Sequence, residues 1–449
     1  MFQTRVLPWV PLALGVVACG EGSSSGPASS PPKAVDPAAV TTATLDPPAQ
    51  APEATSAAKT RTAEDLTAST EELTTDIRNA NAFTAKLLAR TKKGENAMVS
   101  GTSMRHALAT TYLGARGATA SEMATALSLD KDAKTAAHLA RAELAAWQDA
   151  RGNAELNIAS RLWVDDDYQL QPDFTKIALS GFGAAPATVD YGKSEEARKT
   201  INGWVAQQTK DKIPELLPQG SIDGRTQLVV TNAIWFKGRW EFPFPKTATK
   251  DEAFKLDAQK SVTTPLMHLT DSFRIATLPG LKVLELRYAD SQLAMLVALP
   301  DEPEPSAIAK LEAALGPETF AKWTAALATA RVDVTLPRFT FRGGGSMNST
   351  LQDLGMKTAF SEKADFSGIA APRAGEPLYM SQVVHQTWVA VDELGTEAAA
   401  ATGATMRTTS VVTGPVVEFR ADHPFLFFVS DVKQGRVLFA GRVLNPKAS

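Results

Sequence analysis

Apolar residues recur with helical spacing in the first part of the folded region and with strand spacing after it. In NAFTAKLLARTK, Phe83, Leu87 and Leu88 fall on one helix face, and helical patterns run from near Ala63 to about Arg151. Beyond that point, short runs rich in β-branched and aromatic residues predict strands. These runs are LNIASRLWV, TQLVVTNAIWF, KVLELRY, LAMLVALP, RVDVTLPRFTF, HQTWVAV, VVEF, PFLFFVS and RVLFAGRV. Because helices and strands do not alternate regularly, we predict an α+β fold.

The N-terminal segment has a different composition from the rest of the chain. Residues 20–63 consist mainly of Ser, Pro, Ala and Thr, with few large apolar side chains. Such a segment cannot bury enough surface to offset the entropy lost on ordering, so we predict a disordered tether. No Pro/Ser-rich linker divides the later region. We therefore expect a signal peptide at 1–18, a tether at 19–65 and one folded domain at 66–449.

The single cysteine, Cys19, rules out an internal disulfide and sits directly after an apolar stretch. Arg5 opens a short basic start, and VLPWVPLALGVVA then leads into VVAC. This arrangement resembles a bacterial lipoprotein signal, in which cleavage precedes the cysteine and the thiol carries the lipid. The alternative is an ordinary secretory signal with a chance cysteine. The resemblance implies a secreted protein that is lipid-anchored to a bacterial membrane, at the outer membrane or cell surface.

Composition and charge exclude several classes of partner. The chain has 449 residues, of which 44% are hydrophobic and 21% charged, and its net charge is −3. This is a globular composition without the basic footprint of a nucleic-acid-binding protein. Since no run of about 18 or more apolar residues follows the N-terminus, we expect membrane attachment only through the lipid anchor.

Catalytic and metal-binding motifs give no support for an enzyme. GSSSG (22–26) matches a nucleophile elbow but lies in the predicted tether, where no strand and helix flank it. The five histidines lack metal-ligand spacing, and GFGAAP misses the last glycine of the dinucleotide fingerprint. We therefore predict a protein that is not an enzyme and needs no metal or cofactor. A surface hydrolase is the distant alternative.

The stretch GTEAAAATGATMRTTS (395–410) fits neither a packed element nor a simple solvated loop. By intrinsic propensity, Ala398–Ala401 favours helix. Yet Gly395 and Gly403 bracket the run, and no apolar residue recurs at three or four positions to hold a helix against a core.

The first part of this stretch (395–402) belongs to VDELGTEAAAAT (391–402), which resembles the hinge of the reactive-centre loop in serpins, the serine protease inhibitor family. Further segments resemble serpins in the family's order from about residue 76 to 446. They are YLGARGATASEM (112–123), TNAIWFKGRWEFPF (231–244), LGMKTAFSEKADFSGI (354–369), FRADHPFLFFV (419–429) and LFAGRVLNP (438–446).

The resemblance implies helices around a large central mixed sheet, with a mobile reactive-centre loop. A protease cuts the loop and forms an acyl-enzyme. The loop then inserts into the central sheet as an extra strand and disables the protease. The alternative is a non-inhibitory serpin-fold module whose loop is only a protease substrate. We expect a monomer whose partners are serine proteases, with cysteine proteases as further candidates.

The physical pattern of the hinge agrees with strand insertion. In a strand, alternate residues point to the same face. One parity consists of Thr396, Ala398, Ala400 and Thr402, which are all small. The other parity consists of Glu397, Ala399 and Ala401. The charge of Glu397 is therefore kept off the face that would be buried, where an unpaired charge is costly.

Other residues match serpin sites one by one. The shutter, where the sheet opens under the entering strand, corresponds to Ser100, Ser103, Asn232 and His385. The breach at the top of that sheet corresponds to Trp240, Arg338 and Glu393. An Arg338–Glu393 ion pair is expected to steady the uninserted loop, although an exposed pair contributes under about 1 kcal/mol. The chain departs from the family pattern at Gly101, where proline is usual, and at Leu394 and Gln386, where charged residues are frequent.

The cleaved bond in the family usually follows the seventeenth residue counted from the hinge glutamate. Counting from Glu393 places the bond at Thr409–Ser410. A small β-branched side chain suits the shallow pocket of elastase-like or subtilisin-like proteases. The alternative bond is Arg407–Thr408, because a trypsin-like enzyme would pair the arginine with its pocket carboxylate. We expect trypsin to cleave after Arg407 mostly as in an ordinary substrate, without being trapped.

Overall fold

The computed structural model describes residues 69–448, except 131, 184, 374 and 397–413. The predicted signal peptide and the whole predicted tether, including Cys19, lie outside these residues. The α-helices of the described part are α1 (Thr70–Ala89), α2 (Gly101–Gly114), α3 (Gly117–Leu127), α4 (Ala133–Arg151), α5 (Pro172–Phe182), α6 (Ser194–Gln208), α7 (Pro305–Ala313), α8 (Thr319–Ala326) and α9 (Asn348–Asp353).

The strands follow in the same numbering. They are β1 (Ala97–Val99), β2 (Glu155–Asp165), β3 (Ala187–Val189), β4 (Leu228–Arg239), β5 (Lys250–Lys255), β6 (Ser261–Leu278), β7 (Leu281–Arg287), β8 (Leu293–Pro300), β9 (Ala328–Pro337), β10 (Phe339–Ser346), β11 (Met380–Asp392), β12 (Gly395–Thr396), β13 (Val417–Arg420), β14 (Phe425–Asp431) and β15 (Arg436–Val443).

Helix α1 shows why the early pattern is helical. Ser69 caps its N-terminus by accepting from the Glu72 N–H, and the Glu72 carboxylate accepts from the Ser69 N–H in return. The predicted face is buried, because Phe83, Leu87 and Leu88 have no exposed surface. The last helix of this early group, α4, ends at Arg151 as the pattern predicted.

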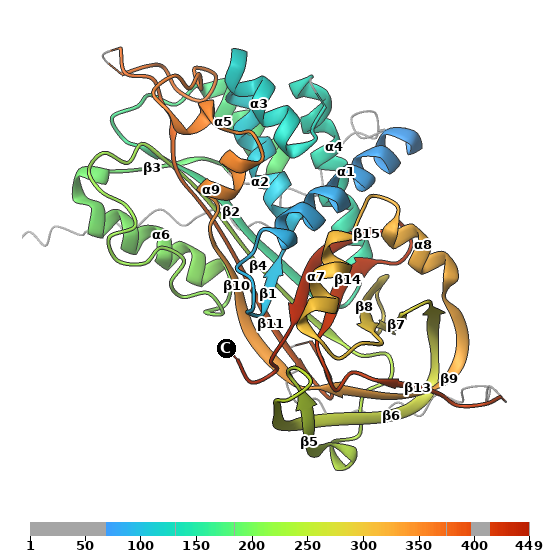
Figure 1. Cartoon of the computed structure of the whole chain (residues 1–449). Coiled ribbons are helices and arrows are strands. Elements are labelled where there is room, and N and C mark those ends of the chain that lie inside the picture. The colour runs from blue at the N-terminus through green and yellow to red at the C-terminus, as the bar shows by residue number, and fades with distance from the viewer. Residues whose placement is uncertain (1–68, 131, 184, 374, 397–413, 449) are drawn as a thin grey trace, which may run out of the picture. The chain divides into compact units, whose positions relative to one another are not determined.

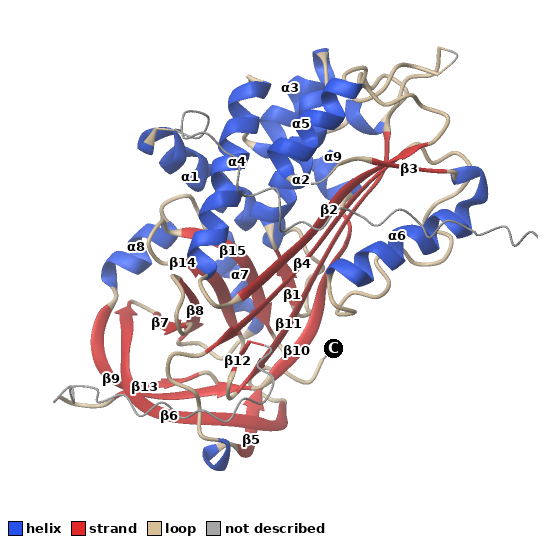
Figure 2. Cartoon of the chain, turned by 180° about the vertical axis from the view of Figure 1, so that it is seen from behind, coloured by secondary structure: helices blue, strands red, loops and turns tan. Residues whose placement is uncertain are grey.

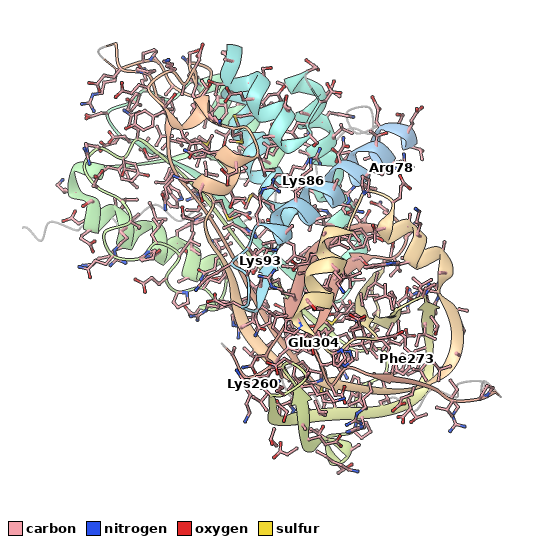
Figure 3. The ribbon with its side chains drawn as sticks, viewed as in Figure 1. Arg78, Lys86, Lys93, Lys260, Phe273 and Glu304 are labelled. Carbon is pink, nitrogen blue, oxygen red and sulfur yellow. The ribbon has the colours of Figure 1, made fainter. Side chains whose placement is uncertain are left out.

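Charged side chains connect α1 to the helices beside it. Arg78, labelled in Figure 3, lies 2.9 Å from the Glu318 carboxylate at the start of α8. Lys93, just beyond α1, lies 3.3 Å from Glu312 of α7. The same carboxylate accepts from Arg442 of β15 at 2.7 Å and is buried with it. Helix α7 is thereby held to both α1 and β15.

One sheet contains both parallel and antiparallel strands. Its six strands lie in the order β10-β11-β12-β4-β2-β3, and β11 also pairs with β4 (Figure 2). The β11–β4 and β2–β3 pairs are parallel, whereas β10–β11 and β2–β4 are antiparallel. This is the large mixed sheet of the predicted α+β fold, and we call its β11–β4 boundary the seam.

The other strands of the described part form a nine-stranded sheet in the order β1-β15-β14-β8-β7-β6-β9-β13, with β5 on β6 (Figure 1). Strands β5 and β6 were not anticipated from the sequence. Strand β6 runs for 18 residues, includes Pro265 and has long stretches that are only partly buried. It pairs with different strands along its length, so no single hydrophobic period marks it.

Helix α6 covers one face of the mixed sheet. Its Ile201 and Val205 are buried in one apolar cluster with Ala159 of β2 and Ala233 of β4. The Arg161 guanidinium of β2 lies 4.3 Å from the ring centroid of Trp204 on α6, a cation–π contact. The segment after α6 therefore begins directly over the mixed sheet.

Candidate functional site

The first two residues of the predicted inserting segment already form a strand. Strand β12 lies between β11 and β4, with Asp392 opposite Gly395 and Val391 opposite Thr396. On its other side, β12 pairs antiparallel with Arg239 and Gly238. Gly395 and Thr396 are therefore already paired on both sides within the mixed sheet. The remaining predicted hinge residues (Glu397–Thr402) and the bonds at 407–410 lie outside the described residues.

Thr396 is buried, with 1% of its surface exposed, as its place on the small-residue face requires. Its hydroxyl oxygen lies 2.7 Å from the hydroxyl oxygen of Tyr288, so the buried polar group has a partner. Burial raises the pKa of Tyr288, which keeps this phenol neutral. The Tyr288 ring stacks on Trp240, with ring centroids 4.7 Å apart and an interplanar angle of 15°.

Gly395 is required by the closeness of β4. A Cβ atom at this position would lie 2.0 Å from the carbonyl oxygen of Gly238 and 2.8 Å from the Cα of Arg239. No L side chain fits at such distances without moving the backbone. The glycine that precedes the alanine run therefore lets β12 enter beside β4.

The turn before β12 is held by the breach residues. The Glu393 carboxylate accepts hydrogen bonds from the Arg338 guanidinium, with 2.8 Å from Nε, and from the Thr249 hydroxyl. Burial works to raise the pKa of Glu393, but these hydrogen bonds outweigh it and the pKa lies below its ordinary value. Trp240 donates from its indole Nε1 to the Asp392 carbonyl at 3.0 Å.

The Arg338–Glu393 pair differs from a surface ion pair in one respect. Only 2% of the Glu393 side chain is exposed, whereas 43% of the Arg338 side chain is. Removing the arginine would leave the buried Glu393 carboxylate without its opposite charge, which costs more stability than losing an exposed ion pair. Thr249, which was not identified from the sequence, supplies the second donor.

The shutter residues form one buried chain of hydrogen bonds. The Ser100 N–H donates to His385 Nε2 at 2.9 Å, so His385 Nδ1 carries the proton and donates to Asn232 Oδ1 at 2.6 Å. The Asn232 amide then donates to Ser103 Oγ at 2.7 Å and to Ser160 Oγ at 2.6 Å. Burial lowers the pKa of His385 to about 4, so the ring is neutral at neutral pH, as this chain requires.

This chain of hydrogen bonds links α2 to the strands on both sides of the seam. His385 of β11 lies directly opposite Asn232 of β4. Ser160 of β2 completes the set and was not identified from the sequence, because serine in a strand gives no distinctive signal. The structure brings the four predicted shutter residues together.

The departures from the family pattern have local explanations in two of three cases. A Cβ at Gly101 would lie 2.4 Å from Thr84 Oγ1 and 2.6 Å from Thr84 Cα, so a proline would collide with α1. Leu394 acts through its backbone, because its N–H donates to Asp392 Oδ1 and its carbonyl accepts from the Trp240 N–H. Nothing in the structure explains Gln386, whose Oε1 is buried with no hydrogen-bond partner in the described part of the chain.

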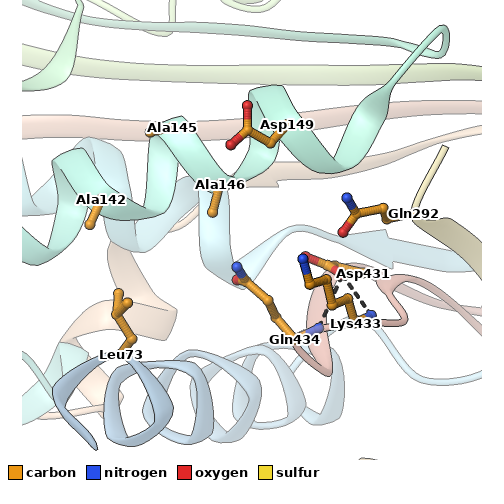
Figure 4. Close-up of a pocket in the computed structure, with 9 residues that line it drawn as sticks. All are labelled: Leu73, Ala142, Ala145, Ala146, Asp149, Gln292, Asp431, Lys433 and Gln434. Carbon is orange, nitrogen blue, oxygen red and sulfur yellow. Dashed lines mark hydrogen bonds between the residues drawn. The ribbon is translucent and has the colours of Figure 1, made fainter. Parts of the chain in front are cut away.

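Other features of the described residues do not suggest a catalytic or cofactor site. A hollow of 280 Å³ between α1, α4 and the β14–β15 turn is lined by three alanines and Asp149 of α4, by Leu73 of α1, and by polar side chains that include those of Gln292 and the turn (Figure 4). Its Asp431 carboxylate accepts from the N–H groups of Lys433 and Gln434, which closes the turn. The carboxylates of Asp165–Asp167 lie together, but Asp167 is paired with Arg373. No helix in the described part is both long and apolar enough to cross a membrane.

Comparison with known proteins decides the family. The model of the serpin family, serine protease inhibitors, matches residues 78–446. The chain is a serpin. Members of this family are named as inhibitors of serine proteases.

The relatives and solved structures agree with this assignment. Leukocyte elastase inhibitor of Bos taurus is 39% identical over 359 residues, covering 78% of this serpin and 93% of the relative. The Homo sapiens protein of the same name is 38% identical over 368 residues, covering 80% and 95%. The structure titled cleaved Serpin 42Da is 32% identical, with a TM-score of 0.72 over 83% of this serpin and 98% of that chain. Uncleaved ovalbumin is 29% identical, with a TM-score of 0.73 over 83% and 100%.

Proposed function

We propose that this serpin traps serine proteases as a suicide substrate, by inserting its cleaved loop into the seam between β11 and β4. The observation that carries the proposal is β12, because Gly395 and Thr396 already occupy the position that begins such a strand. After cleavage, the residues that follow Thr396 would extend β12 between β11 and β4 as these two strands separate. The small side chains of Ala398, Ala400 and Thr402 share the parity of buried Thr396.

The target class follows from the relatives and from the predicted cleaved bond. The relatives named leukocyte elastase inhibitor suggest an elastase-like protease. Thr409 before the bond would fit a shallow primary pocket of an elastase-like or subtilisin-like enzyme. Arg407 would suit a trypsin-like enzyme instead, but cleavage there would leave the inserting segment two residues shorter. We propose no cofactor in this reaction.

A protease panel tests both the mechanism and the bond. Elastase-like or subtilisin-like proteases should give complexes that survive denaturing electrophoresis, and mass analysis should show a released C-terminal peptide that begins at Ser410. Trypsin should mostly turn the protein over at Arg407. A peptide beginning at Thr408 together with efficient trapping of trypsin would instead assign the Arg407–Thr408 bond. Complete cleavage by every protease without any stable complex would favour the non-inhibitory alternative.

We further propose that Cys19 is lipidated and becomes the mature N-terminus, so that the inhibitor is anchored to a bacterial membrane. The support is the apolar stretch that ends in VVAC, followed by a long polar segment. Metabolic labelling with a radioactive fatty acid should mark the wild type, which should appear in the membrane fraction. The variant Cys19→Ser should lose both the label and membrane attachment. Label retained in that variant would refute lipidation at Cys19 and favour an ordinary secretory signal.

A further inference from the structure

The segment directly after α6 lies across the seam. We call residues 210–212 the strap. Lys210 and Asp211 have φ angles of +49° and +59°, a left-handed conformation that residues other than glycine adopt rarely. Two such residues in succession form a tight turn that neighbouring contacts must hold in place. Just after the turn, the Ile213 N–H donates to Thr209 Oγ1 at 3.2 Å, which ties the strap to the end of α6.

On one side of the seam, the strap contacts β4 and β2. Lys210 Nζ lies 5.5 Å from the ring centroid of Trp235 on β4, within the range of a cation–π contact. The same ammonium group forms an ion pair with Glu155 of β2. Trp235 itself is 1% exposed, so its ring is covered where the lysine lies over it.

On the other side of the seam, the strap contacts β11 and β10. Lys212 Nζ lies 4.9 Å from the ring centroid of Trp388 on β11. The Lys212 carbonyl accepts a hydrogen bond of 3.3 Å from the Arg342 guanidinium of β10. The strap thus contacts the strands on both sides of the seam, with Lys210 beside Trp235 of β4 and Lys212 beside Trp388 of β11.

The two tryptophans are a pair in the strand register. Trp388 and Trp235 lie opposite each other and are the last residues of the parallel β11–β4 pairing before β12 begins. Further along the same strands, Thr396 lies between Val391 of β11 and Gly238 of β4. If the residues after Thr396 extend β12 between β11 and β4, the Trp235–Trp388 pair is the first pair of the seam that must separate.

We propose that the strap clamps this first closed pair of the seam, and that Lys210 and Lys212 are positioning residues that set the rate of strand insertion. The inference rests on the proposed function, because it assumes that the strand enters below Thr396. When Trp235 and Trp388 separate, one lysine or the other must leave its ring, so the contacts stabilise the closed seam and are lost as it opens. Removing either cation should therefore speed insertion.

The experiment measures insertion without a protease. A synthetic peptide with the sequence of residues 397–409 is incubated with the full-length protein, and its incorporation is followed by native electrophoresis and by the rise in melting temperature. Loss of one cation–π contact should speed incorporation about two- to fivefold in Lys210→Ala and in Lys212→Ala. The double variant should be faster than either single variant.

Matched variants separate the cation–π clamp from general loosening. Lys212→Arg keeps a cation over Trp388 and should incorporate the peptide at the wild-type rate. Lys199→Ala removes an exposed lysine from α6 and should also leave the rate unchanged. Because 61% of the Lys210 side chain is exposed, its removal should leave folding intact. Wild-type rates in both alanine variants, or a Lys212→Arg variant as fast as Lys212→Ala, would overturn the proposal.

The outcome is distinguishable from failure of the proposed function. If the protease panel gives no stable complex but the alanine variants still accelerate peptide incorporation, protease trapping is wrong and the clamp stands. If complexes form and the variants do not accelerate incorporation, the clamp is wrong and trapping stands.

Discussion

Replacing Thr396 by arginine is expected to convert this serpin from an inhibitor into a substrate of its target protease. Thr396 is buried beside Tyr288 at the first position of the inserted strand. A guanidinium there would lie on the buried face without a counter-ion, at a cost of several kcal/mol. Since each increment of about 1.4 kcal/mol in the barrier slows insertion about tenfold, hydrolysis of the acyl-enzyme should win.

The measurement is the fraction of cleaved inhibitor that is found in a complex stable to denaturing electrophoresis. In Thr396→Arg this fraction should fall to below about one-tenth of the wild-type value. The rate of loop cleavage should be unchanged, because the protease attacks a distant bond. Thr396→Ser, which keeps a small side chain and a hydroxyl for Tyr288, is the matched control and should still form complex. Undiminished complex in the arginine variant would contradict insertion along this face.

Cleavage of the loop is expected to raise the thermal stability of the whole domain sharply. Among the described residues of the intact protein, β12 comprises Gly395 and Thr396, and β11 pairs directly with β4 from Met380 to Trp388. Inserting roughly a dozen further residues would add a strand's worth of hydrogen bonds at about 1 kcal/mol each. That gain is comparable with the whole stability of a typical domain, about 5–15 kcal/mol.

Calorimetry of intact and nicked protein tests this expectation. For a domain of this size, such a gain should raise the melting temperature by on the order of 10 °C or more. The nicked Thr396→Arg variant supplies the control, because an impeded strand should give a smaller rise. Equal melting temperatures for the intact and nicked wild type would speak against insertion and support a non-inhibitory module.

The hinge illustrates how much of the site the local sequence could predict. The alternation of residues along a strand depends only on backbone geometry, so the small-residue face of Thr396 and Ala398 could be identified from spacing alone. The burial of Thr396 agrees with that parity. The sequence did not show that β12 is already paired, because pairing depends on the distance between β11 and β4 at their upper ends, which no local pattern records.

The breach and the shutter likewise combine residues that were predicted from the sequence with residues that were found only in the structure. Asn232 and Glu393 stand in segments that resemble the family, and Arg338 and His385 match serpin sites one by one. Their partners Thr249 and Ser160 are common residue types, and no motif around them in the sequence marks them. Such residues acquire a role only when distant segments meet.

The sequence by itself determined the family, the α+β class, the apolar face of α1, most strands and the burial of Thr396. These properties follow from backbone periodicity and from the chemistry of residues that are close along the chain. Only the tertiary structure decided that the Tyr288 hydroxyl forms a hydrogen bond with Thr396 and that Thr84 leaves no room for a side chain at Gly101. It also decided that the strap crosses the seam at Trp235 and Trp388. The physical reason is that these contacts join segments far apart in the sequence, and strand register and helix packing together set the distances between them.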